Sequence, residues 1–184
     1  MWMGEPDSAV NWSVDYAAEV GADAIGFTVY SGSNNEVEMY EEFRDVQEKA
    51  REHDMGTVMW SYPRGQGLKN DTKPSVIAYA ARVALELGAD IAKIKYPGSG
   101  DAMAEAVEMA GPTSVVMSGG SKTDDLDFLQ TVETAVENGA KGLAVGRNVF
   151  QRENPVEILD ALEAVIFEEA SAEAAVERTS ATAD

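Results

Sequence analysis

Short apolar runs along the chain alternate with longer segments in which apolar residues recur every three or four positions. The short runs predict strands and the longer segments predict amphipathic helices. The expected strands cover residues 24–30, 57–62, 92–98, 114–117 and 142–145. The expected helices cover residues 13–20, 36–52, 75–87, 101–109, 124–137 and 155–168. Strands that alternate with helices in this way indicate an α/β fold built on a parallel sheet.

Two parallel architectures fit this alternation, an open doubly wound sheet and a (β/α)8 barrel. The chain has no Gly-x-Gly-x-x-Gly after a strand and no P-loop, which disfavours a nucleotide-binding open sheet. Its unusual polar residues lie at the carboxyl ends of strands, and glycine-rich turns follow the last two strands. Barrel enzymes place a phosphate site after their last two strands. We therefore expect a TIM (β/α)8 barrel, although a complete barrel has three more strands than this chain.

The chain length of 184 residues suffices for one domain with a hydrophobic core. We assign residues 1–168 to a portion of one barrel. Residues 169–184 contain mainly Ala, Glu, Ser and Thr and offer little to bury, which predicts an acidic, disordered tail.

Acidic residues dominate the charge: 33 Asp and Glu stand against 14 Lys and Arg, for a formal net charge of -19. Nucleic-acid binding needs a basic face, so this class of partner is excluded. The carboxylates are spread over many predicted helices, a pattern that suits a protein kept hydrated in concentrated salt. A halophilic source is our hypothesis from this pattern.

Cysteine is absent and histidine occurs once, at His53. Disulfides, thiol chemistry and a histidine-based metal site are therefore excluded from the sequence interpretation. The chain also has no apolar run of membrane length and no secretory signal pattern. We expect a cytoplasmic protein without a membrane partner.

The strand at 92–98 contains two lysines, Lys93 and Lys95. Side chains alternate along a strand, so both should emerge on the same face. Burial and like-charge crowding disfavour the protonated amine, which is one way a lysine becomes a nucleophile near neutral pH. The alternative is that both lysines only solubilise an exposed strand end.

The strand at 57–62 places two aromatic residues, Trp60 and Tyr62, on one face. Tyr62 comes at the carboxyl end of the strand, where a phenol could relay a proton to a carbonyl-derived intermediate. Packing of both rings beneath a loop is the alternative.

Two glycine-rich turns follow the last strands. One contains Ser118, Gly119 and Gly120, and the other contains Gly146 and Arg147. Their backbone N–H groups, together with the arginine, predict a cradle for a phosphate. Lys122 could add positive charge there or could be a solvated loop residue.

Four segments in this order resemble the archaeal-type class I fructose-bisphosphate aldolases: residues 60–65, 93–96, 118–123 and 146–151. The resemblance implies that Lys93 forms a Schiff base with the substrate ketone, that Tyr62 takes part in proton transfer and that Trp60 lines the substrate site. It also implies that the two glycine-rich turns hold a substrate phosphate, with Lys95 as an electrostatic neighbour of Lys93. Such an enzyme is a lyase of glycolysis and gluconeogenesis that needs no metal or cofactor, acts on a phosphorylated sugar and forms homo-oligomers.

The sequence departs from this family at its beginning. Family members have three further strands before the one at 24–30, and the first of these carries an acid/base aspartate that nothing here matches. We therefore expect only the last five βα units, in a chain that is truncated relative to the family or completed by another chain. Two other functions stay open: the related 2-amino-3,7-dideoxy-D-threo-hept-6-ulosonate synthase of archaeal aromatic amino-acid biosynthesis, and a non-catalytic phosphate-binding remnant.

Overall fold

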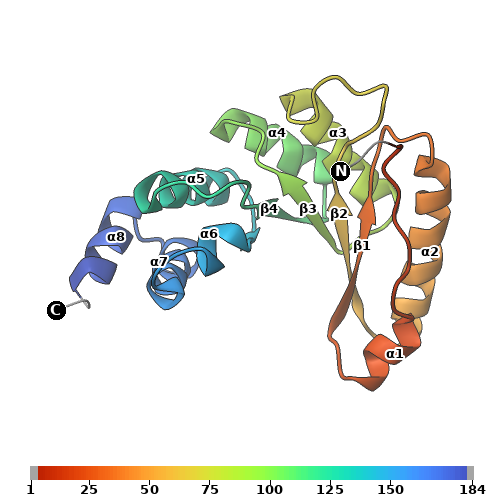
Figure 1. The fold of residues 1–184 in the computed structure, drawn as a ribbon, viewed down its shortest axis with the longest axis horizontal. Helices are drawn as coiled ribbons and strands as arrows, with labels where there is room; N and C mark the ends of the chain where they lie inside the picture. Colours follow the sequence, from red (N-terminus) through yellow and green to blue (C-terminus); the bar gives the residue numbers. More distant parts are fainter. Residues whose placement is uncertain (1–3, 182–184) are drawn as a thin grey trace.

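The computed structural model describes residues 4–181, which form one parallel sheet and its covering helices (Figure 1). The strands are β1 (Ala24–Val29), β2 (Gly56–Ser61), β3 (Ile91–Lys95), β4 (Ser114–Ser118) and β5 (Leu143–Ala144). The helices are α1 (Val14–Glu19), α2 (Glu36–Glu52), α3 (Pro74–Glu86), α4 (Gly100–Ala110), α5 (Asp125–Glu137), α6 (Arg147–Phe150), α7 (Pro155–Phe167) and α8 (Ala172–Ala181).

The strands pair in sequence order, β1-β2-β3-β4-β5, and every pairing is parallel. Each connection between neighbouring strands passes through at least one helix, as in a βα barrel. The five βα units expected from the sequence are therefore confirmed. Within residues 4–181 the sheet is open, with β1 and β5 at its two edges.

The two faces of the sheet differ in burial. In β3, Ala92 and Ile94 are fully buried beneath helices, whereas Lys93 and Lys95 are only partly buried. In β2, Met59 is likewise fully buried and Trp60 is not. The helix-covered face thus holds the hydrophobic core, and the predicted common face of the two lysines is confirmed.

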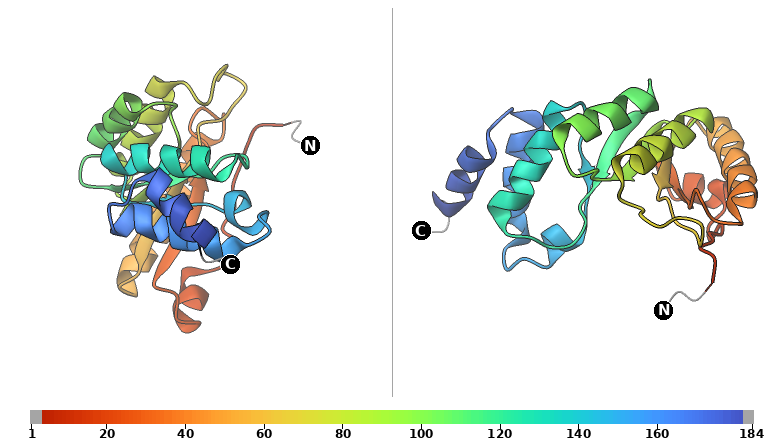
Figure 2. Two further views of the ribbon diagram at one scale, coloured as in Figure 1. Left: turned by 90° about the vertical axis from the view of Figure 1, so that its left-hand side faces the viewer. Right: turned by 90° about the horizontal axis from the view of Figure 1, so that it is seen from above.

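Helices α1 and α2 lie at one end of the molecule and α5 to α8 at the other, with α3 and α4 between them (Figure 2). At one end α1 and α2 pack near β1, and at the other end α7 packs against both α5 and α8. The carboxyl ends of the middle strands lie between these groups.

The end of the chain corrects one prediction. Residues 172–181 form α8, where we expected a disordered tail over 169–184; residues 182–184 lie outside the described part. Ala172 and Ala175 are fully buried in the main core. Small side chains with little apolar surface still pack closely when a neighbouring helix offers a matching surface, and the sequence does not show that surface. The four-residue helix α6 was also missed, because so short a helix has no measurable periodicity.

Two loops at the carboxyl ends of β1 and β2 touch through their backbones. The Arg64 N–H donates to the Ser31 carbonyl at 3.1 Å. A Cβ added to Gly65 would lie 1.7 Å from the carbonyl oxygen of Gly32. Only glycine permits this approach, which holds the β2–α3 loop beside the site described next.

Candidate active site

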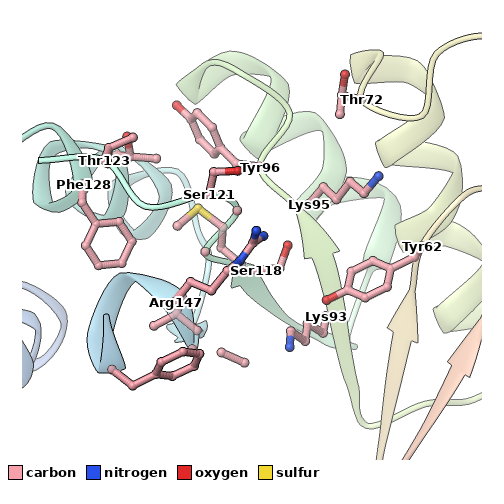
Figure 3. Close-up of a pocket in the computed structure, with 18 of the residues that line it drawn as sticks. Tyr62, Thr72, Lys93, Lys95, Tyr96, Ser118, Ser121, Thr123, Phe128 and Arg147 are labelled. Atoms are coloured by element: carbon pink, nitrogen blue, oxygen red, sulfur yellow. The ribbon is translucent and has the colours of Figure 1, made fainter. Parts of the chain in front are cut away.

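A cavity of about 660 Å³ opens at the carboxyl ends of β2, β3, β4 and β5, between these strands and helices α5 and α6. Figure 3 shows Tyr62, Lys93, Ser118 and Arg147 converging on it from different elements. Lys95 and the two glycine-rich turns also line the cavity. The fold therefore brings together most of the site residues that the sequence predicts.

Lys93 projects from β3 into this cavity. Burial lowers the pKa of its amine, because a charged group loses hydration when it is removed from water. Its Nζ lies 5.8 Å from the centroid of the Trp60 ring, within the range of a cation–π contact. An amine of this kind is neutral more often than an exposed lysine and can attack a carbonyl carbon.

Lys95 lies on the same face but has a different environment. Its side chain is 20% exposed and forms an ion pair with Asp71, a residue of the β2–α3 loop. The hydrogen bond from Lys95 lowers the pKa of the Asp71 carboxyl. Of the two causes inferred from the sequence for a lowered pKa of Lys93, burial is the one the structure shows, and like-charge crowding by Lys95 is not.

The Tyr62 ring points toward Lys93 from the end of β2 (Figure 3). Burial raises the pKa of its phenol, and this outweighs a hydrogen bond to Ser118 and the positive charge of Arg64, both of which lower it. The hydroxyl is therefore protonated at neutral pH and is available as a proton donor.

Trp60 differs from its expected position. It does not line the main cavity but a second one of about 460 Å³, on the β1 side of the sheet. A Cβ added to Gly26 would lie 2.9 Å from the Trp60 ring, so the indole lies flat against bare backbone. Its link to the site in this chain is the contact with Lys93.

The two glycine-rich turns form the wall opposite Tyr62. Ser118, Gly119, Gly120, Gly146 and Arg147 all line the cavity, as predicted for a shared cradle. The backbone N–H groups of Gly120 and Gly146 lie in the turns themselves, outside strands β4 and β5, and within residues 4–181 neither donates to another backbone carbonyl. Such N–H groups beside an exposed arginine can receive an anion.

Close packing also explains why residue 119 is a glycine. A Cβ there would lie 2.3 Å from Cγ1 of Val145, so the end of β4 can approach the end of β5 only without a side chain. Gly120 has a φ of 61°, in the left-handed region that glycine adopts at low cost.

Lys122 does not contribute charge to the cavity. Its Nζ donates to the Gln151 carbonyl at 2.8 Å, and the side chain lines a separate cavity of about 450 Å³. Among the lining or neighbouring residues that were not predicted as site residues are three polar or charged ones, Arg64, Asp71 and Thr72. All three lie in the polar β2–α3 loop, where no periodicity signals which side chain turns inward.

No group of three or more His, Cys, Asp or Glu side chains within the described residues could hold a metal ion. Nor is any helix in that part of the chain long and apolar enough to cross a membrane.

Comparison with protein families matches residues 3–152 to the model described as DeoC/LacD family aldolase. The class 1 fructose-bisphosphate aldolase of Halobacterium salinarum is 73% identical over 178 residues, which are 97% of this chain and 68% of that protein. The sequence thus spans about two thirds of this relative's length.

Solved structures give the same result. A crystal structure of an archaeal fructose 1,6-bisphosphate aldolase superposes with a TM-score of 0.88 at 47% identity, over 91% of this chain and 67% of that one. A second, described as the Schiff base forming fructose-1,6-bisphosphate aldolase, has a TM-score of 0.88 at 46% identity, over 90% of this chain and 67% of its own.

Proposed function

This chain belongs to the DeoC/LacD family of aldolases, and we propose that it is a class I fructose-bisphosphate aldolase with Lys93 as its nucleophile. The reaction is the reversible cleavage of fructose 1,6-bisphosphate into dihydroxyacetone phosphate and glyceraldehyde 3-phosphate. The observation that carries the proposal is a lysine with a burial-lowered pKa in the same cavity as two glycine-rich turns and Arg147.

Lys93 begins the reaction. Its neutral amine attacks the C2 ketone of the open-chain sugar, and loss of water from the carbinolamine gives an iminium ion. The C3–C4 bond then breaks: its electron pair moves to C3 to form an enamine, and the C4 hydroxyl loses its proton as glyceraldehyde 3-phosphate forms. Protonation of C3 and hydrolysis of the iminium release dihydroxyacetone phosphate and restore the lysine.

Tyr62 takes part in the proton transfers. Its ring points toward Lys93, and a tyrosine phenol carries its proton at neutral pH, so it can donate that proton to the leaving carbinolamine hydroxyl.

The glycine-rich turns bind one phosphate of the sugar. The N–H groups of Gly120 and Gly146, which donate to no backbone carbonyl within the described part of the chain, supply hydrogen bonds, and Arg147 supplies positive charge. A phosphorylated sugar is therefore the substrate class we propose. A homo-oligomer in the cytoplasm is our further expectation from the family resemblance.

Reductive trapping tests the nucleophile. Incubation with dihydroxyacetone phosphate and borohydride should add one triose phosphate to the peptide that contains Lys93, as read by mass spectrometry. A label on Lys95 would overturn the assignment of roles, and no label on either lysine would contradict the aldolase mechanism.

One observation favours a second candidate function, a phosphate-binding protein without catalysis. Among the described residues that line the main cavity, none is Asp or Glu, so no carboxylate is in place for acid/base work. Phosphate binding without trapping at Lys93 would favour this second candidate, and cleavage of fructose 1,6-bisphosphate would exclude it.

A further inference from the structure

Asn148 is a buried polar residue directly behind the cavity wall. It is 1% exposed, lies in α6 immediately after Arg147, and does not line the cavity itself. A buried amide is stable only where its hydrogen-bonding groups are satisfied, so its partners indicate why it is there.

The Asn148 amide uses its hydrogen-bonding capacity on the turn after β4. Its Nδ2 donates to the carbonyls of Gly119 and Ser121, at 2.5 and 3.0 Å. Its Oδ1 accepts from the Thr123 N–H at 3.1 Å. Only an amide supplies two donors and one acceptor in this arrangement, because a carboxylate cannot donate and an apolar side chain leaves all three backbone groups unpaired.

These bonds fix the direction of the N–H group that faces the cavity. The Gly119 carbonyl and the Gly120 N–H belong to one planar trans peptide, so they point in opposite directions. Because the carbonyl is held toward Asn148, the Gly120 N–H is directed away from it. Gly120 lines the cavity and Asn148 does not, so that direction leads to the cavity side.

Arg152 fixes the other side of the same connection. Its guanidinium donates to the Asn148 carbonyl at 2.6 Å and to the Thr123 carbonyl at 3.3 Å, and it forms an ion pair with Asp125. The backbone that carries Arg147 is thereby joined to the turn after β4 by both Asn148 and Arg152.

We propose that Asn148 is a positioning residue that orients the Gly120 N–H and holds Arg147 opposite it, so that both engage one phosphate of the substrate. This inference rests on the proposed function for the identity of the phosphate. The hydrogen bonds from Asn148 to the turn after β4 are part of the fold and do not depend on that function. Asn148 acts through the turn and does not touch the substrate.

The test compares two ketones that differ only in the phosphate. Borohydride trapping at Lys93 is measured with dihydroxyacetone phosphate and with dihydroxyacetone, both below saturation, and the ratio of the two rates reports phosphate recognition. In Asn148→Asp this ratio should fall about tenfold or more, because the carboxylate cannot donate to the Gly119 and Ser121 carbonyls and the released Gly120 N–H loses its hydrogen bond to the charged phosphate. The rate with dihydroxyacetone should stay near its original value.

Asn138→Asp is the matched control. The Asn138 Nδ2 also donates to a backbone carbonyl, that of Thr134 at 2.8 Å, but at the end of α5 away from the cavity. The control should leave the ratio unchanged. Asn148→Ser serves where the aspartate variant does not fold, and the same fall in ratio is expected from it.

A folded Asn148 variant with an unchanged ratio would overturn the proposal, whether both rates stay the same or fall equally, since an equal fall indicates a purely structural role. Failure of the aldolase function is recognised separately, as absence of trapping by either ketone in the unmodified chain. Calorimetric binding of inorganic phosphate then decides the role of Asn148: weaker binding in the variant supports it, and equal binding refutes it.

Discussion

At the ends of β2 and β3 the cavity is lined by side chains that the strands themselves hold out, whereas at the ends of β4 and β5 it is lined mainly by backbone. Lys93 and Tyr62 belong to the first half, and Gly119, Gly120 and Gly146 belong to the second. Strand alternation is enough to orient the first set. Orienting the second set needs hydrogen bonds from a side chain outside the turn, which Asn148 supplies.

This difference teaches that the two halves fail in different ways when they are mutated. A side chain on a strand can be removed without disturbing its neighbours, so its loss affects one chemical step. Backbone groups in a turn are lost only when the turn moves, so their loss affects binding and packing together.

Replacement of the nucleophile should produce the largest effect. Lys93→Met should reduce trapping with dihydroxyacetone phosphate to background, because it removes the amine proposed to form the Schiff base. The measurement is the labelled fraction of the Lys93 peptide. Lys95→Met is the control on the same strand face and should keep the label on Lys93; loss of the label in both variants would contradict the unequal roles.

Removal of the phosphate-side charge should have a smaller effect. Arg147→Met should weaken binding of dihydroxyacetone phosphate about tenfold, the effect of losing a charge-assisted hydrogen bond. Titration calorimetry measures this change. Lys122→Met should bind almost normally, since Lys122 is bonded to the Gln151 carbonyl outside the cavity; equal weakening in both variants would show a diffuse charge effect instead.

The contact between the first two loops should be sensitive to a single methyl group. Gly65→Ala should lower the free energy of unfolding by about 1–3 kcal/mol, because the new Cβ meets the Gly32 carbonyl and the loop must shift. Gly67→Ala in the same loop meets nothing within 4 Å and should change stability little. Chemical denaturation measures both variants, and equal stability would show that the loops do not depend on this approach.

The pH dependence should separate Lys93 from an ordinary lysine. Its pKa in the folded state is below 10.5, so the trapping rate should rise with pH and level off before that value. Between the folded-state pKa and 10.5 the unfolded chain binds more protons, so the stability of the unmodified chain should rise with pH relative to Lys93→Met. A stability difference that stays constant with pH would contradict the lowered pKa.

Loss of the ion pair between Lys95 and Asp71, near the ends of β2 and β3, should have the smallest effect. Asp71→Asn should cost about 0.2–1 kcal/mol of stability at low salt, as expected for a partly exposed pair, and about nothing at 1 M salt. Asn148→Asp provides the comparison at the ends of β4 and β5. Salt screens the Asp71–Lys95 ion pair but does not screen the loss of the hydrogen bonds that the Asn148 amide makes. The acidic composition predicts in addition that the whole chain becomes more stable as salt is added.

Much of the fold follows from local patterns. Apolar periodicity located all five strands to within a few residues, and alternation placed Lys93 and Lys95 on one face. Glycine after one strand is often only turn chemistry, and the glycine-rich turns were recognised because they follow two adjacent strands and have an arginine beside them. The family resemblance is confirmed by the matched family model and by the relatives.

Long-range contacts decided the rest. The sequence indicates no partner for Lys95, and only the folded β2–α3 loop brings Asp71 to it. Trp60 shares a strand face with Tyr62, yet its ring turns to the β1 side because Gly26 leaves space there. Helix α8 depends on a surface of its neighbours that no local pattern reveals.

The sequence by itself therefore determined which residues emerge on one face of the sheet and which turns can approach a phosphate, because strand periodicity and glycine's conformational freedom are local properties. The tertiary structure alone decided which lysine is ion-paired, that burial without like-charge crowding lowers the pKa of Lys93, and that Asn148 joins two turns 27 to 29 residues apart along the chain. The hydration of a lysine, its ion-pair partner and the hydrogen bonds of a buried amide all depend on which groups lie nearby in space, and separation along the sequence does not determine those groups.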